Sequence, residues 1–252
     1  MLVVVVAVCC HGASALEAGE LLGVIGLRRG GVTIVCEDVR KENLALIART
    51  AETLGVGSIY AISSQRMGAH LRGFGDLSDE TKAAQLSKIS RSASDWVSLR
   101  HFDSPEQCVE ALRRDGFDTL VATTPPRPGT VDVYDEVAGD WTSKRPALLF
   151  GSESQGLSPA LLEAADICVS VPQRGMTQSL NVAACAALVL GETLRRRDKA
   201  KIVDTLAEHE QQRLIDVLSQ PLRLHNKAHI KQHRFTYRKA FKAESDFERH
   251  NF

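Results

Sequence analysis

The sequence lacks the features that mark several common functional classes. Its 31 basic and 31 acidic side chains cancel, so net charge gives no sign of a nucleic-acid partner, and any such sign must come from local clustering. The six cysteines form no CxxC pair and no histidine stands at metal-ligand spacing, so we predict no metal site. Neither a GxGxxG segment nor a GxxxxGKS or GxxxxGKT segment is present, which disfavours a generic nucleotide-binding protein.

Aromatic residues and long apolar runs are also scarce. Aromatic residues make up 5% of the chain, so broad stacking on single-stranded bases is not the expected binding mode. The apolar run at 2–10 is too short to cross a bilayer, and we predict no membrane association. Because the small residues 13–15 follow it, residues 1–15 are either a targeting segment or only an apolar N-terminal segment. The expected location is intracellular: the cytoplasm, or an organelle if residues 1–15 are a targeting signal.

Short β-branched runs alternate with helical patterns from residue 32 onward. This alternation predicts an α/β fold, in which a mostly parallel sheet carries helices on both faces. The expected strands cover 32–36, 58–62, 96–99, 119–122, 147–150 and 167–171. The expected helices cover 43–54, 80–89, 104–115, 159–165 and 178–197, and 63–91 is a surface excursion. No internal repeat is visible, which argues against a repeat architecture.

We expect the main domain to span 32–198, with additional segments at both ends. Residues 16–31 are predicted to form an N-terminal helix, and 199–252 a helical, basic C-terminal extension whose helix covers 203–218. No acidic residue interrupts the stretch 221–242 at the end of that extension. It is either a solvated tail or an electrostatic contact to RNA phosphates.

The first of three motifs, NLALIART, lies at 43–50. Asn43 is placed to cap a helix, and Arg49 then lies nearly two turns inside it. Taken alone, this segment is better explained by a capped surface helix with a solvated arginine.

The second motif, LLFGSESQGLSP at 148–159, is typical of a strand that ends in a glycine turn. The turn would place Glu153 at the carboxyl end of the sheet, the edge at which open α/β folds bind ligands. Gly151 and Gly156 permit a close backbone approach or a positive φ, and Ser158 fits a helix N-cap that is followed by proline. A plain strand-to-helix turn would explain the same residues without a role for Glu153.

The third motif, VPQRGMTQSLNV at 171–182, leads into the Ala-rich helical pattern 183–197. In order and spacing the three motifs resemble those of the SpoU/TrmH family of SPOUT RNA ribose 2′-O-methyltransferases, and the resemblance extends over 32–197. Within that family the chain is most similar to the tRNA (guanosine-2′-O-)methyltransferase branch, which modifies a guanosine in the tRNA D-loop. It departs from that branch in a longer segment between Ser63 and Trp96 and in extra residues within 131–144.

The resemblance implies a C-terminal trefoil knot whose loops hold S-adenosylmethionine as cosubstrate, without a metal. It also implies a homodimer and an RNA partner, with tRNA as the expected RNA. The residues that it places around the cofactor are Thr123, Gly151, Val171, Gly175, Met176 and Leu180. The residues that it places around the reacting ribose are Asn43, Arg49, Glu153, Ser179 and Asn181.

Two roles are open for Arg49 under this resemblance. The family's usual proposal makes this arginine the general base for the ribose hydroxyl. An ordinary guanidinium loses its proton only above about pH 12, so a neutral arginine at pH 7 costs on the order of 7 kcal/mol. We therefore expect a clamp on phosphate and on the developing alkoxide. The alternatives for the whole protein are an rRNA ribose 2′-O-methyltransferase and a non-catalytic RNA-binding protein of the same fold.

Overall fold

The computed structural model describes residues 28–63, 80–90, 93–136, 140–176, 179–203, 205–206, 208 and 210–212. These residues belong to one compact unit. The predicted segment 1–15 and most of the predicted helix 16–31 lie outside the described residues, as do the basic stretch 221–242 and most of the predicted helix 203–218. No helix in the described ranges is long and apolar enough to span a membrane.

A seven-stranded sheet lies at the centre of the described chain, with strand order β3-β2-β1-β6-β4-β7-β5. Its strands are β1 (Thr33–Glu37), β2 (Ser58–Ile62), β3 (Ser98–Phe102), β4 (Thr119–Thr123), β5 (Val131–Asp132), β6 (Pro146–Phe150) and β7 (Ile167–Ser170). Each pair of neighbouring strands is parallel. The predicted parallel sheet is therefore confirmed, and its strands share one carboxyl edge.

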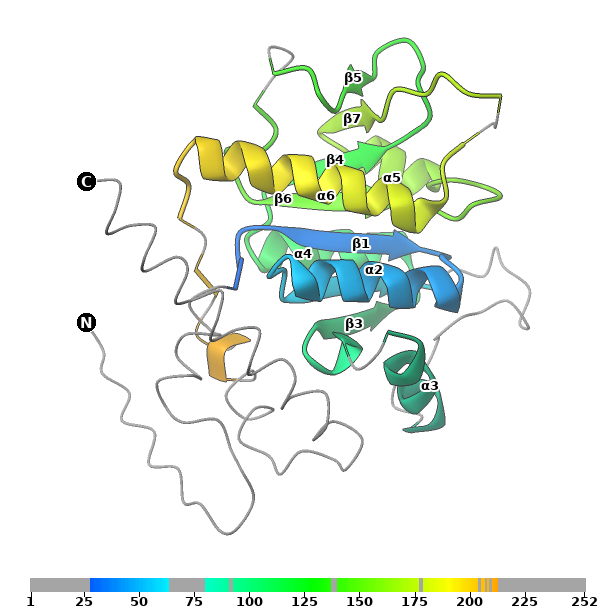
Figure 1. Ribbon diagram of the computed structural model, residues 1–252, viewed down its shortest axis with the longest axis vertical. Coiled ribbons are helices and arrows are strands. Elements are labelled where there is room, and N and C mark those ends of the chain that lie inside the picture. Colours follow the sequence, from blue (N-terminus) through cyan, green and yellow to red (C-terminus); the bar gives the residue numbers. More distant parts are fainter. Residues whose placement is uncertain are drawn as a thin grey trace, which may run out of the picture. The chain divides into compact units, whose positions relative to one another are not determined.

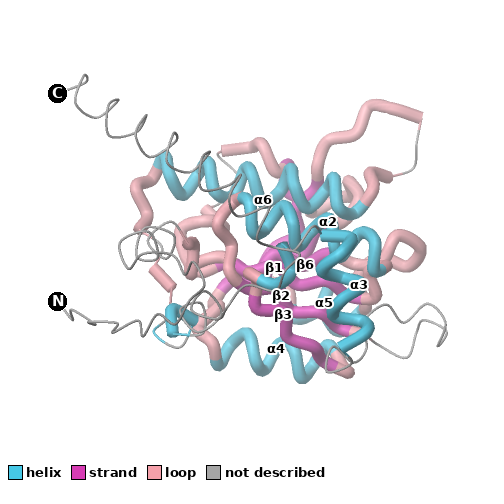
Figure 2. The backbone as a smooth tube through the Cα atoms, turned by 60° about the horizontal axis from the view of Figure 1, so that its bottom comes forward, coloured by secondary structure: helices cyan, strands magenta, loops and turns pink. Residues whose placement is uncertain are grey.

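Helices cover both faces of this sheet, as predicted (Figures 1 and 2). The helices are α2 (Lys41–Thr53), α3 (Glu80–Ser90), α4 (Pro105–Arg114), α5 (Pro159–Ala164) and α6 (Val182–Lys199), with a short 3₁₀ turn at Ala93–Asp95. Ile34 belongs to the apolar core that contains residues of α2, α3 and α6, whereas its neighbour Val35 belongs to the core that contains residues of α4 and α5. Because successive side chains of β1 point to opposite faces of the sheet, this strand contributes apolar residues to both cores.

Several element ends differ from the predictions for local reasons. Strand β3 begins at Ser98 instead of 96, because the Trp96 N–H bonds to the Ala93 carbonyl and closes the 3₁₀ turn. Strand β5 was not predicted, since two residues are too few to show a strand period. Residues 28–31, the end of the predicted N-terminal helix, form an isolated bridge and a turn instead.

Arginine side chains of α6 form hydrogen bonds with both ends of the connection between β5 and β6. The guanidinium of Arg196 donates to the carbonyl oxygen of Val133 at 2.6 Å. Arg197, which is buried, donates to the carbonyl oxygens of Thr142 and Lys144. Guanidinium groups can bind several carbonyls at once, so α6 holds a connection whose described residues, 133–136 and 140–145, form no helix or strand.

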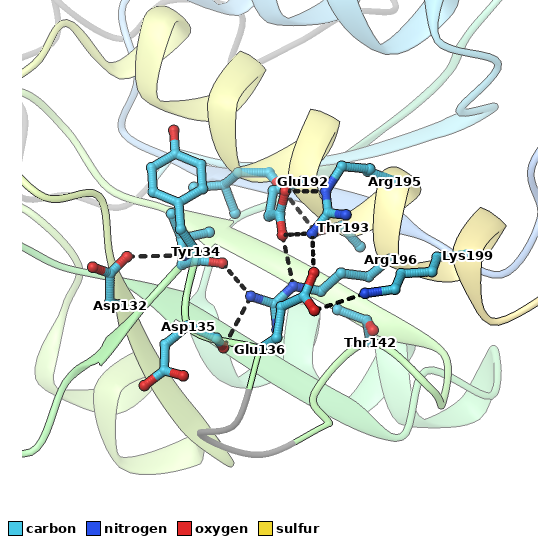
Figure 3. Close-up of polar contacts among 12 residues, drawn as sticks. Asp132, Tyr134, Asp135, Glu136, Thr142, Glu192, Thr193, Arg195, Arg196 and Lys199 are labelled. Atoms are coloured by element: carbon cyan, nitrogen blue, oxygen red, sulfur yellow. Dashed lines mark hydrogen bonds and ion pairs between the residues drawn. The ribbon is translucent and has the colours of Figure 1, made fainter.

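An ion-pair cluster on the same part of α6 adds to this attachment (Figure 3). Glu136 accepts from Arg195 and from Lys199, each at 2.7 Å. These hydrogen bonds from Lys199 and Arg195 lower the pKa of Glu136 to about 2. The pairs are largely exposed, so each contributes little to stability individually.

Candidate functional site

Three adjacent strands bring candidate residues to the carboxyl edge of the sheet. Thr123 ends β4, Gly151 directly follows β6 and Val171 directly follows β7. Strand β4 lies between β6 and β7. Thr123 pairs with Val169, which is two residues before Val171. Open parallel sheets bind ligands at this edge. Three of the six residues predicted around the cofactor therefore lie where a ligand can bind.

The turn after β6, residues 151–158, has a backbone that only particular residues allow. A Cβ at Gly151 would overlap the backbone of Gly156 and Leu157, because the turn folds back on itself through a bridge between Ser152 and Gly156. Gly156 has a φ of +64°, which favours glycine. The two glycines thus serve different purposes: close approach at Gly151 and a left-handed conformation at Gly156.

The same turn carries Glu153 and ends in a capped helix. The Ser158 side chain accepts from the Leu161 N–H at 3.3 Å, and Pro159 occupies the first turn of α5. The predicted N-cap and proline are therefore confirmed. Glu153 itself is exposed at the carboxyl edge of the sheet.

Side chains from the three motifs meet in one hydrogen-bonded chain. The amide of Asn43 donates to the Glu153 carboxylate, and the Asn181 amide donates to the Asn43 Oδ1 at 3.1 Å. Asn43 comes from α2, Glu153 from the turn after β6, and Asn181 from the residue before α6. Residues 110 and 138 positions apart in the sequence are thereby brought into direct contact.

The capping role predicted for Asn43 is wrong, and Asn181 performs such a role instead. Helix α2 begins at Lys41 with Arg40 as N-cap, so Asn43 lies inside the first turn and its side chain is free to bond Glu153. At α6 the Asn181 Oδ1 accepts from two backbone N–H groups, those of Ala183 and Ala184, at 2.9 and 3.3 Å. The helix therefore begins at 182 instead of the predicted 178.

Arg49 and Ser179 are not part of this hydrogen-bonded chain. Arg49 projects from the exposed side of α2, and Ser179 lies on the exposed segment before α6. Within the described ranges neither side chain has a hydrogen bond or ion pair. An exposed guanidinium without a partner among the described residues is available to an anionic ligand.

The residues expected around the cofactor divide into buried and exposed groups. Val171 is buried at 5% exposure, whereas Leu180 is 39% exposed and Met176 is fully exposed. The Thr123 hydroxyl is buried and has no hydrogen-bond partner among the described residues, and the same holds for Thr124. Buried polar atoms are normally paired, so two unpaired hydroxyls at the carboxyl end of β4 fit a polar ligand held there.

One charged residue of this region was not predicted. Glu37 ends β1, is fully buried, and its carboxylate accepts from the Ser158 N–H at 2.7 Å. The sequence does carry a signal for it, because an acid at the end of the otherwise apolar strand TIVCE is unusual. That signal does not reveal the partner, which is 121 residues away.

The cysteines of the described chain take no part in this arrangement. Burial raises the pKa of the Cys108 thiol to about 12 and that of Cys185 to about 11, and it also raises the pKa of Cys36. Thiols with raised pKa values are poor nucleophiles at neutral pH. In the part of the chain that the structure describes, no group of three or more His, Cys, Asp or Glu side chains could hold a metal ion.

A parallel α/β sheet with polar groups from three separate segments at its carboxyl edge defines the class, and solved structures share the fold. The A. aeolicus TrmH/SpoU tRNA modifying enzyme has a TM-score of 0.61 at 24% identity, covering 80% of this chain and 93% of that one. The SpoU methyltransferase AviRb from Streptomyces viridochromogenes, solved with AdoMet, has a TM-score of 0.52 at 27% identity, covering 74% and 66%.

Sequence comparison identifies the family. Residues 31–191 match the model of the SpoU rRNA Methylase family. The tRNA (guanosine(18)-2′-O)-methyltransferase of Thermus thermophilus is 33% identical over 182 residues, which cover 72% of this chain and 83% of that relative. The chain therefore belongs to the SpoU methylase family.

Proposed function

We propose that this protein transfers a methyl group from S-adenosylmethionine to a ribose 2′-hydroxyl of RNA, and that its substrate is a D-loop guanosine of tRNA. The observation that carries the proposal is the contact of Asn43, Glu153 and Asn181, because each comes from a different family motif. The choice of tRNA is supported by the Thermus relative, which is named for guanosine 18 of tRNA.

The cofactor site proposed here lies at the carboxyl ends of β4, β6 and β7. When bound, S-adenosylmethionine supplies an electrophilic methyl group. Thr123, Gly151 and Val171 are suited to border its adenosine, with backbone groups that recognise the base edge. Gly175, Met176 and Leu180 belong to the exposed segment after β7 and would cover it. The unpaired Thr123 hydroxyl supports this assignment.

Positioning would supply most of the catalysis. Holding a hydroxyl oxygen in line with a methyl group contributes roughly 7–11 kcal/mol of barrier reduction in favourable cases. In our proposal the hydrogen bonds among Glu153, Asn43 and Asn181 hold the three motif segments together around the ribose. Ser179 contacts the substrate beside them. Arg49 clamps a phosphate and stabilises the developing alkoxide, since its guanidinium has no competing partner among the described residues.

An Arg49→Lys variant tests the role of Arg49, with Arg49→Ala as its control. Lysine loses a proton far more readily than arginine but lacks the planar fork that grips a phosphate. A clamp predicts that kcat falls in both variants, by about tenfold or more for each lost charge-assisted contact. Full activity of Arg49→Lys would contradict the clamp.

We also propose a trefoil knot and a homodimer. The knot is supported by the strand order, since β6 enters the sheet between β1 and β4 and the chain then returns to β7 on the far side of β4. The dimer is supported by Leu46 on α2 and Leu188 on α6, apolar side chains that are 46% and 41% exposed on neighbouring helices. Light scattering at the concentration of the activity assay tests the dimer, and a monomer there would contradict it.

The basic stretch 221–242 is proposed to bind tRNA phosphates. Deleting the chain from residue 221 onward should weaken tRNA binding and flatten its dependence on salt. Unchanged affinity would mean that this stretch is only a solvated tail. Because tRNA and S-adenosylmethionine are intracellular, we place the protein in the cytoplasm, or in an organelle if residues 1–15 direct it there.

The deciding experiment is methyl transfer from labelled S-adenosylmethionine to unmodified tRNA and rRNA transcripts. The methylated position is mapped by its resistance to alkaline cleavage, which needs a free 2′-hydroxyl. A signal at a D-loop guanosine is the expected result. A signal on rRNA alone would make the protein an rRNA methyltransferase, and RNA binding without methylation would make it a non-catalytic binding protein.

A further inference from the structure

Glu37 is a buried acid at the end of the interior strand β1, and nothing in the proposed reaction uses it. Side chains alternate along β1, so Glu37 lies on the same face as Val35, the face covered by α4 and α5. Its exposure is 0%. An apolar residue at this position would avoid the free-energy cost of burying a carboxylate. A favourable contact of the Glu37 carboxylate must therefore offset that cost.

One contact of Glu37 is to the turn that carries Glu153. Its Oε2 accepts from the Ser158 N–H at 2.7 Å, the length of a charge-assisted hydrogen bond. Ser158 is the N-cap of α5 and the last residue of the turn 151–158. Glu37 therefore fixes the point where this turn passes into the helix, from a strand in the middle of the sheet.

The other end of the turn is already fixed by its own backbone. Gly151 continues directly from β6, and the Gly156 N–H bonds to the Ser152 carbonyl at 2.9 Å. With both ends of the turn held, Glu153 projects from it toward Asn43. If the contact between Glu37 and Ser158 were lost, the second end would move and Glu153 would lose its defined position.

We propose that Glu37 is a positioning residue, which holds the turn 151–158 through the Ser158 N–H and thereby keeps Glu153 in contact with Asn43. The expected effect of Glu37 on kcat rests on the proposed methyl transfer. The expected effect of Glu37 on the turn 151–158 concerns the free protein and does not depend on the substrate.

Two variants separate the reach of the side chain from its charge. Glu37→Gln keeps the length and an acceptor oxygen but loses the charge, whereas Glu37→Asp keeps the charge and draws the acceptor back by one methylene. Because the position of the acceptor matters in our proposal, Glu37→Asp should be the impaired variant and Glu37→Gln should retain most of the wild-type behaviour. Glu192→Asp is the matched control, since Glu192 is also buried but pairs with Arg195 and Arg196 of its own helix α6.

Amide hydrogen exchange of residues 152–158, measured without RNA or cofactor, is the first readout. Glu37→Asp should raise exchange there by about tenfold, as expected for loss of one hydrogen bond to a charged acceptor, while Glu37→Gln and Glu192→Asp leave it near wild type. Methyl transfer to tRNA is the second readout. Glu37→Asp should lower kcat by about tenfold with little change in the KM for tRNA, and Glu37→Gln should restore kcat.

Either of two results overturns the proposal: exchange at 152–158 that is unchanged in Glu37→Asp, or a Glu37→Gln protein as impaired as Glu37→Asp. A lowered melting temperature with unchanged kcat would equally reduce Glu37 to a structural residue. If the wild-type protein methylates no RNA, the proposed function fails, but the exchange experiment still decides whether Glu37 holds the turn.

Discussion

Replacing Asn181 by aspartate separates two tasks that this side chain performs. Its Oδ1 accepts from the first N–H groups of α6, while its Nδ2 donates to Asn43 at 3.1 Å. Aspartate keeps an acceptor for the helix and adds negative charge at its N-terminus, but it has no N–H for Asn43. We therefore expect Asn181→Asp to keep the cap and to lose the link to the site.

The magnitudes distinguish this variant from Asn181→Ala. Removing an N-cap costs about 1 kcal/mol, and each such unit lowers Tm by roughly 2–4 °C in a domain of this size. Asn181→Asp should keep a Tm close to that of the wild type, because negative charge at a helix N-terminus contributes about 0.3–1 kcal/mol and offsets much of the lost bond to Asn43. Both variants lose the bond to Asn43, worth about 0.5–1.5 kcal/mol, so kcat should fall roughly 2- to 12-fold in each.

Thermal unfolding and methyl transfer to a saturating tRNA transcript give the two quantities. Ser104→Ala is the control, because Ser104 caps α4 by accepting from the Gln107 N–H at 3.3 Å and is not among the site residues. It should lower Tm without changing kcat. A wild-type kcat in Asn181→Asp would refute the argument that this hydrogen bond organises the site, and a Tm as low as that of Asn181→Ala would refute the argument about the cap.

Three further predictions concern the rest of the domain. Gly151→Ala should abolish activity and lower Tm by several degrees, because its Cβ would overlap the backbone of the turn; wild-type kcat and Tm would contradict this. Arg197→Met should destabilise the protein by about 3 kcal/mol or more, since carbonyls of Thr142 and Lys144 lose their donor; denaturant unfolding measures it, and a change below about 1 kcal/mol would argue against the attachment. The pKa of Glu136 is lowered to about 2, so its stabilising contribution is present above about pH 4.5, where the unfolded carboxyl is ionised, and is lost as pH falls toward 2. The Tm difference between wild type and Glu136→Gln should therefore shrink across that interval, and a constant difference would contradict it.

The alternation of β-branched runs and helical patterns was enough to predict the sheet and its two helical layers. The runs around Ile34, Ile59 and Leu148 are buried almost completely because parallel strands are covered on both faces. Such strands read as continuous apolar segments, which a sequence shows clearly. Strand β5 was missed because Val131 and Asp132 join the sheet only through their pairing with β7.

Three of the residues predicted around the ribose, Asn43, Glu153 and Asn181, meet in the structure, but the sequence did not predict the contacts between them. Asn43 follows the local rule for an N-cap, yet a partner 110 residues away takes its side chain instead. Glu37 and Arg197 were missed because their partners are backbone N–H and carbonyl groups, which every residue carries. Contacts of this kind leave no pattern in side-chain spacing, so only the folded chain reveals them.

The joining of distant segments in this site also has a consequence for how the protein is made. Strand β1 pairs with β6, more than one hundred residues later in the chain, and Asn43 and Asn181 meet across 138 positions. During synthesis the first half of the sheet must therefore wait for its central partner. Contacts so far apart in sequence slow folding, and a ribosome-bound chain that ends before residue 181 has no complete site. The protein should become able to act on RNA only when nearly the whole domain has been made.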